Sequence, residues 1–155
     1  MDDVWFLRRA IAISHQSAVS GGGPFGAVIV RSGQIIGEGT NSVVPHTDPT
    51  AHAEIVAIRK ACQTLGTHVL DQAIIYSTCE PCPMCLAAIW WARIAEIVYS
   101  NTRHDAALIG FDDEELYREA AAPLENRRLP LRRMLADEAK LVFEAWLNNP
   151  HRVPY

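Results

Sequence analysis

Two short segments of this chain carry residue types that could do metal chemistry. Segment 52–54 (HAE) supplies an imidazole and a carboxylate, and segment 81–85 (PCPMC) supplies two thiols. One imidazole and two thiolates are three zinc ligands, and three protein ligands leave a tetrahedral Zn²⁺ one open position for water. The open position distinguishes a catalytic zinc site from a structural one, in which the protein fills all four positions. The sequence therefore predicts one catalytic zinc ion held by His52, Cys82 and Cys85.

Glu54 is placed to move protons beside this metal. Residues two apart at a helix start point in different directions, so His52 can bind the ion while Glu54 reaches the water. Together, H-x-E and P-C-x-x-C match the signature of zinc-dependent nucleobase deaminases, in which the glutamate is an acid/base and not a ligand. We expect Glu54 to be catalytic.

The flanking residues predict that both ligand segments open helices. Pro83 suits a first helical turn, where its missing N–H needs no partner. Residues 83–92 then read as a short apolar helix whose N-terminal dipole favours thiolates. The second helix is expected over 52–65, with Gly66 as its stop.

The remaining cysteines leave other readings open. Cys79 could supply a fourth ligand and close a structural zinc site, but Glu54 would then have no role. An iron–sulfur run would need a cysteine at position 89, which is isoleucine. A buried thiol at the end of the apolar run 73–78 is the ordinary explanation of Cys79, and Cys62 reads as a core residue.

Size and composition indicate one globular domain spanning residues 1–155. The 155 residues are 49% hydrophobic and 21% charged, which is ordinary for a soluble protein. No apolar stretch approaches the length of a membrane span, and the N-terminus is acidic where a signal peptide would be basic. Without a disulfide framework, we expect a cytoplasmic protein.

The net charge of −4 argues against an electrostatic grip on nucleic acid. One basic cluster could form a local patch, although a solvated turn is the plainer reading. Its members are Arg127, Arg128, Arg132 and Arg133.

The order of the expected elements predicts an α/β fold. Strands alternating with helices after an opening hairpin indicate a mixed, five-stranded sheet with helices on both faces, in three α/β/α layers. The site is expected where loops follow the carboxyl ends of parallel strands. The expected helices are 2–19, 52–65, 83–92, one within 103–122, and 138–147; the expected strands are 25–31, 34–41, 73–78, 95–100 and 131–135.

Further motifs extend over nearly the whole chain. They are GGPFGAVIV at 22–30, EGTN at 38–41, DPTAHAE at 48–54, CEPCPMC at 79–85, WAR at 91–93, GFDD at 110–113, FEAW at 143–146 and Tyr155. With these motifs the sequence resembles the bacterial guanine deaminases of the short, cytidine-deaminase-like type. The likeness implies a cytidine-deaminase-like fold, one Zn²⁺ per subunit, and hydrolysis of guanine to xanthine and ammonia in purine catabolism or salvage.

The resemblance also implies a substrate pocket. Asn41 and the backbone beside Ala53 would hydrogen-bond the purine. Phe25 and Trp91 would form apolar walls against its faces. Without the family likeness, Phe25 and Trp91 read as core aromatics and Asn41 as a turn residue.

Two further roles come from the same likeness. Asp113 would read the guanine edge and share proton transfer with Glu54, although an acidic residue at a helix start is favoured by the dipole alone. Asp112 reads as the helix cap. Members of this type are homodimers that exchange C-terminal segments, here about 137–155, so Tyr155 would close the pocket of the partner.

Three other functions remain open at this stage. A tRNA adenosine deaminase would need a basic surface and room for a flipped base. A cytosine deaminase would not need the Asp113 contact, because its pyrimidine is smaller. A non-catalytic zinc module that binds a partner would be indicated by a closed site containing Cys79.

Overall fold

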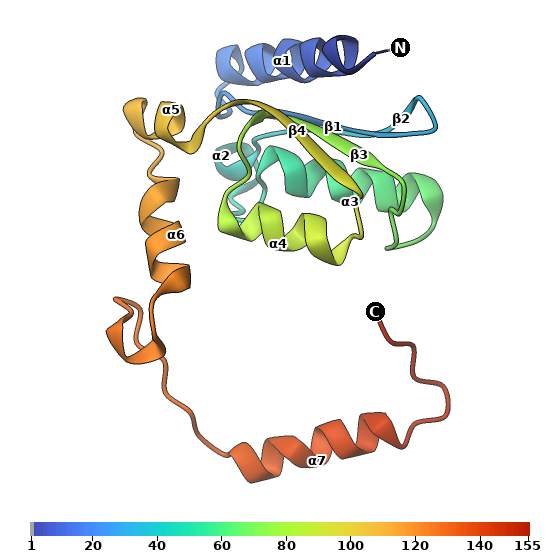
Figure 1. Ribbon diagram of the computed structural model, residues 1–155, viewed down its shortest axis with the longest axis vertical. Coiled ribbons are helices and arrows are strands. Elements are labelled where there is room, and N and C mark those ends of the chain that lie inside the picture. Colours follow the sequence, from blue (N-terminus) through green and yellow to red (C-terminus); the bar gives the residue numbers. More distant parts are fainter. Residues whose placement is uncertain (1) are drawn as a thin grey trace. The chain divides into compact units, whose positions relative to one another are not determined.

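The structure, a computed structural model, describes residues 2–155, which form two compact units, Met1–Ala120 and Ala121–Tyr155. The first unit contains the sheet and the helices packed on it (Figure 1). The second contains a short 3₁₀ turn, Leu124–Asn126, and helix α7, Ala136–Leu147. None of the helices in residues 2–155 has the length and apolar character needed to cross a membrane.

The sheet is mixed, as expected, and has the strand order β2-β1-β3-β4. Strands β1 (Gly26–Arg31) and β2 (Gln34–Thr40) form an antiparallel hairpin. Positive φ angles at both turn residues between them match the twist of the strands. Strand β3 (Ile74–Cys79) pairs antiparallel with β1 and parallel with β4 (Glu96–Asn101).

The prediction of a fifth strand at 131–135 is wrong. These residues have no regular structure, and the sheet of the described chain has four strands. The side chains in this segment are exposed, so its apolar residues do not form the buried face of a strand. A strand also needs a neighbour to receive its backbone hydrogen bonds, and a local pattern cannot show whether one is present. A short helix, α2 (Val43–His46), lies between β2 and α3, where the sequence predicts neither a helix nor a strand.

Helices cover both faces of the sheet, which confirms the three-layer α/β/α arrangement (Figure 1). Helix α1 (Asp3–Val19) buries Phe6 and Ala10 against Val28 and Tyr76 on one face. Helices α3 (Ala53–Leu65) and α4 (Pro83–Trp91) pack on the other. Helices α5 (Arg103–Leu108) and α6 (Asp113–Ala121) follow β4.

Glycines on β2 let the backbone of α3 pack directly against the backbone of the strand. A Cβ atom at Gly39 would overlap the carbonyl oxygen of Ala53, and one at Gly37 would overlap that of Ala57. Both obstacles are backbone atoms, so no side-chain rotation could relieve the clash. This close contact sets the depth at which the start of α3, with His52 and Glu54, lies against the strands.

We expect Gly39→Ala to lower the free energy of unfolding by about 1–3 kcal/mol, because the added methyl overpacks a backbone contact. Denaturant unfolding followed by circular dichroism measures the change. Gly33→Asn, at a hairpin position that asparagine tolerates, is the control and should unfold near the wild-type midpoint. An unchanged midpoint for Gly39→Ala would show that α3 can shift at no cost.

Candidate metal centre and active site

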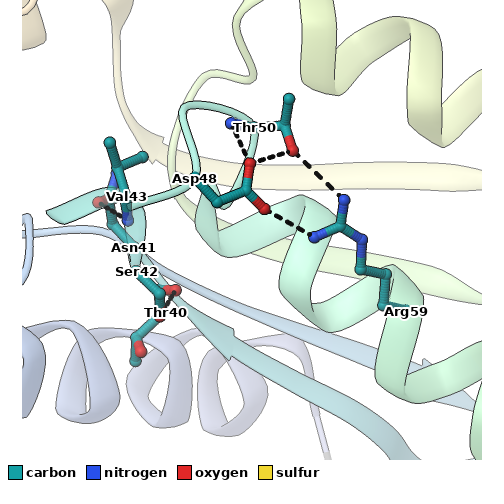
Figure 2. Close-up of polar contacts among 7 residues, drawn as sticks. All are labelled: Thr40, Asn41, Ser42, Val43, Asp48, Thr50 and Arg59. Carbon is teal, nitrogen blue, oxygen red and sulfur yellow. Dashed lines mark hydrogen bonds and ion pairs between the residues drawn. The ribbon is translucent and has the colours of Figure 1, made fainter. Parts of the chain in front are cut away.

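A polar clamp holds the loop that leads into α3 (Figure 2). One carboxylate oxygen of Asp48 accepts hydrogen bonds from the Thr50 backbone N–H at 2.8 Å and from the Thr50 hydroxyl at 2.7 Å. Arg59, farther along α3, donates to Asp48 and to Thr50, each at 3.3 Å. The clamp fixes the path of the chain into His52, the N-cap residue of α3.

The two cysteines lie at the start of α4, as expected. Cys82 is the N-cap residue, Pro83 occupies the first turn, and Cys85 follows within that turn. Both sulfur atoms lie 3.6 Å from Nδ1 of His52. The three ligand atoms lie within 4.8 Å of one another.

This spacing fits a zinc ion. Zn–S bonds of about 2.3 Å and Zn–N bonds of about 2.0–2.1 Å, meeting at a tetrahedral angle, would separate sulfur and nitrogen by about 3.5–3.6 Å. The observed distances of 3.6 Å agree with that value. His52, Cys82 and Cys85 therefore form a group that could hold the metal, as predicted.

The two thiols of this group differ in acidity. A hydrogen bond from the Cys85 thiol lowers the pKa of Cys82 to about 4, and the same bond raises the pKa of Cys85. The hydrogen bond with Cys82 raises the pKa of His52. The protein thus carries one thiolate ready for a cation, and zinc binding would release the remaining thiol proton.

Cys79 lies outside the ligand group. Its sulfur contacts the carbonyl oxygen of Thr102 at 3.6 Å, and burial raises the pKa of its thiol to about 11. A protonated thiol that already has a hydrogen-bond partner is a poor fourth ligand. Within residues 2–155 the group contains three protein ligands, which is the open arrangement.

Glu54 is buried beside the metal ligands, with 6% of its surface exposed. One carboxylate oxygen accepts a hydrogen bond from the Ser77 hydroxyl at 3.2 Å, and the other contacts the Cys85 thiol at 3.5 Å. Burial raises the pKa of the carboxyl. A carboxyl whose pKa is raised holds a proton more readily than a free glutamate does, and this favours a role in acid–base catalysis.

A cavity of about 450 Å³ opens over these groups. Phe25 and Phe111 lie on two walls of the cavity. Their rings pack edge to face, with centroids 4.8 Å apart. Asn41, also in the lining, is oriented by a 3.3 Å hydrogen bond from the Val43 backbone N–H to its side-chain oxygen (Figure 2). The cavity thus combines aromatic walls with a few polar groups, the usual composition of a small-molecule site.

Asp113 joins the cavity from the first turn of α6. Burial raises the pKa of its carboxyl, and the nearby Cys82 thiolate raises this pKa further. The neighbouring Asp112 accepts a hydrogen bond from the Glu115 backbone N–H at 3.2 Å, which confirms its reading as the helix cap. The structure therefore brings Asp113 into one cavity with Glu54 and the metal ligands.

Comparison with known families agrees with this geometry. Residues 1–101 match the family described as the cytidine and deoxycytidylate deaminase zinc-binding region. The chain belongs to this zinc-binding deaminase family. Its membership accounts for the pairing of a three-ligand metal group with a buried glutamate.

Among known deaminases, the chain is 47% identical to the guanine deaminase of Bacillus subtilis over the full length of both proteins. The crystal structure of that protein superposes with a TM-score of 0.97, covering 100% of this chain and 99% of the other. A guanine deaminase from Nitrosomonas europaea is 32% identical with a TM-score of 0.67, over 70% of this chain and 63% of that one. A tRNA-specific adenosine deaminase from Aquifex aeolicus is 41% identical, covering 64% of this chain and 66% of its own.

Two residues expected in the pocket of this deaminase are not among those that line the cavity. Trp91 ends α4, opposite the end that carries the cysteines, is 57% exposed, and is not among the residues that line the cavity. Tyr155 belongs to the second unit and is 78% exposed. Their roles as a wall and as a closing residue stay predictions.

Sequence reasoning missed three contributors to the site. Ser77 binds Glu54, Phe111 supplies an aromatic wall, and the Tyr117 hydroxyl donates to the Pro81 carbonyl at 2.7 Å. Ser77 had a usable signal, since a polar residue inside a buried strand usually has a polar partner. Phe111 lies within the GFDD motif, where only the acids drew attention.

We expect Cys85→Ser to weaken zinc binding by more than about 100-fold, because even partners of the ligands are worth about 10–100-fold. Metal analysis of purified protein against a chelator series measures the loss. Cys79→Ser is the matched control and should retain about one zinc per chain. Equal loss in both variants would mean that Cys79 is a ligand.

Proposed function

We propose that this protein hydrolyses guanine to xanthine and ammonia with one zinc ion per subunit. The observation that carries the proposal is the position of Asp113 in the cavity with Glu54 and the metal ligands. The full-length likeness to a guanine deaminase supports it. Because the cysteines are free thiols that must stay reduced to bind metal, we also propose that the enzyme acts in the cytoplasm.

Asp113 accounts for selection of guanine by hydrogen-bond complementarity. An ionised carboxylate only accepts hydrogen bonds. Guanine offers it two adjacent donors, the ring N1–H and the 2-amino group. Adenine has a bare acceptor nitrogen at N1, so a carboxylate there would meet a repelling lone pair. On this proposal, Asp113 determines both which base binds and how it is oriented.

The remaining pocket residues would hold the base in place. The Asn41 carboxamide and the backbone beside Ala53 would bind the polar edge, while Phe25 would cover one face of the ring. Phe111, packed on Phe25, adds a second aromatic side to this wall. We retain Trp91 as a proposed wall residue. Fixed aromatic contacts and two polar anchors restrict the purine to one orientation.

Glu54 would carry the protons of the reaction. A zinc ion held by His52, Cys82 and Cys85 would lower the pKa of its bound water to about 7. Glu54 would accept one proton of the attacking water and give it to the ring nitrogen beside C2, while the water oxygen bonds to C2. Glu54, helped by Asp113, would then move the second proton of that water to the 2-amino group. The C2–N bond breaks as the C2 carbonyl forms, and the amine leaves as ammonia. Ser77 keeps the Glu54 carboxyl aimed at the site through its hydrogen bond.

A tRNA adenosine deaminase activity is the second candidate, since the chain is also similar to such enzymes. Two observations disfavour it. The similarity to the Aquifex aeolicus enzyme spans 64% of this chain, whereas the similarity to the guanine deaminase of Bacillus subtilis spans all of it. The net charge of −4 also gives no general attraction to an RNA backbone.

The direct test incubates zinc-loaded protein with guanine, adenine, cytosine and an adenosine-containing RNA stem-loop and measures ammonia. We expect release from guanine alone. Glu54→Gln should retain zinc and lose about 10²–10⁴-fold in kcat, because it cannot shuttle protons. Release only from the RNA would overturn the assignment, and near-normal activity of Glu54→Gln would remove Glu54 from the mechanism.

We further propose a homodimer that exchanges its C-terminal segments, about residues 137–155. No residue in 121–155 is buried within the chain, and α7 exposes large apolar side chains, among them Phe143 at 72%. A segment of this length cannot form a core of its own. A second copy would give the apolar side of α7 a surface to cover, and Tyr155 would then close the partner's pocket.

Subunit mixing tests this exchange. We expect Tyr155→Ala to lower kcat/KM by about 10–100-fold through poorer closure. Coexpression with Glu54→Gln subunits should then restore about a quarter of wild-type activity, because half of the dimers are mixed and each has one intact site. Activity that does not rise above that of the separate variants would mean that Tyr155 acts in its own chain or not at all.

A further inference from the structure

Asp113 depends on a helix that has little packing of its own. Helix α6 buries none of its side chains, although its first turn faces the cavity. A surface helix without a buried face is not fixed by apolar packing. Some other contact must therefore hold its first turn over the metal ligands.

Tyr117 provides such a contact. Its hydroxyl donates a 2.7 Å hydrogen bond to the carbonyl oxygen of Pro81, the residue immediately before Cys82. Asp113 and Tyr117 are four residues apart on α6, so their side chains lie on the same side of the helix. The side of α6 that presents Asp113 to the cavity is thus tied to the segment that carries a metal ligand.

The ring of Tyr117 is held as well as its hydroxyl. The guanidinium carbon of Arg103 lies 4.5 Å from the ring centroid, a cation–π distance. Glu80 accepts a 3.0 Å hydrogen bond from the Arg103 backbone N–H, and its other carboxylate oxygen lies 3.9 Å from the guanidinium. These contacts connect α5, α6 and the segment before α4 through Tyr117.

We propose that Tyr117 is a positioning residue that holds Asp113 over the cavity through its bond to Pro81. The inference rests on the proposed function, in which Asp113 reads guanine. Tyr117 is not among the residues that line the cavity. On this proposal, its effect on the reaction passes through Asp113.

Kinetics of Tyr117→Phe, Asp113→Asn and the double variant on the zinc-loaded enzyme test this route. Tyr117→Phe removes only the hydroxyl, and we expect kcat/KM for guanine to fall about tenfold, the equivalent of one hydrogen bond. Zinc content should not change. In the Asp113→Asn background the same change should cost less than about twofold, because the group it positions is gone. A full tenfold loss in that background, or a loss of zinc, would overturn the proposal.

Hydrogen exchange gives a readout independent of catalysis. Tyr117→Phe should speed the exchange of amides in α6 while those of α3 and α4 stay protected. Tyr99→Phe, a matched hydroxyl deletion on β4, should change neither exchange nor activity. Unchanged amide exchange of α6 in Tyr117→Phe would reject the proposal that Tyr117 holds this helix in place. If the wild-type enzyme releases no ammonia from guanine, the proposed function fails, and the exchange result alone decides whether Tyr117 holds α6.

Discussion

The site depends on the meeting of two helix N-termini whose N-cap residues are metal ligands. His52 and Cys82 both have extended backbone angles, and neither side chain caps its own helix. The side chain that would ordinarily satisfy the free N–H groups of the first turn is thus directed to the partner helix. The positive ends of two helix dipoles favour the thiolate form of the ligands.

The same geometry accounts for Glu54. A residue two positions beyond a ligand at a helix start lies in the first turn, and here it is buried against the sheet. Burying a carboxyl disfavours its charge, which raises the pKa of Glu54. Hydrogen bonds from the Ser77 hydroxyl and the Cys85 thiol keep the side chain directed, and the effect of burial on the pKa outweighs the stabilisation of the anion by its hydrogen bonds. The close approach of α3 to β2 at Gly39 keeps this first turn packed against the sheet.

The sequence could predict what local chemistry dictates. The grouping of His52, Cys82 and Cys85, the helix stop at Gly66 and the opening hairpin follow from residue type and spacing, and the structure has each of these features. The strand expected at 131–135 would need a neighbouring strand to pair with, and a local run of apolar residues cannot show whether one is present. Phe111 was missed for a similar reason, because its role arises only when Phe25, distant in sequence, lies against it.

On the proposed function, the metal site and the residue that selects the base come from different parts of the chain. The shared family region ends at residue 101, after the zinc ligands and Glu54. Phe111, Asp113 and Tyr117 all follow it, on α6 and the turn before it. On the proposed function, a common hydrolytic centre can serve different bases, because a later segment adds Phe111 and Asp113 to the pocket. This later segment must be attached to the metal-binding region to hold its residues over the cavity. The hydrogen bond from Tyr117 to Pro81, the residue before Cys82, is one such attachment.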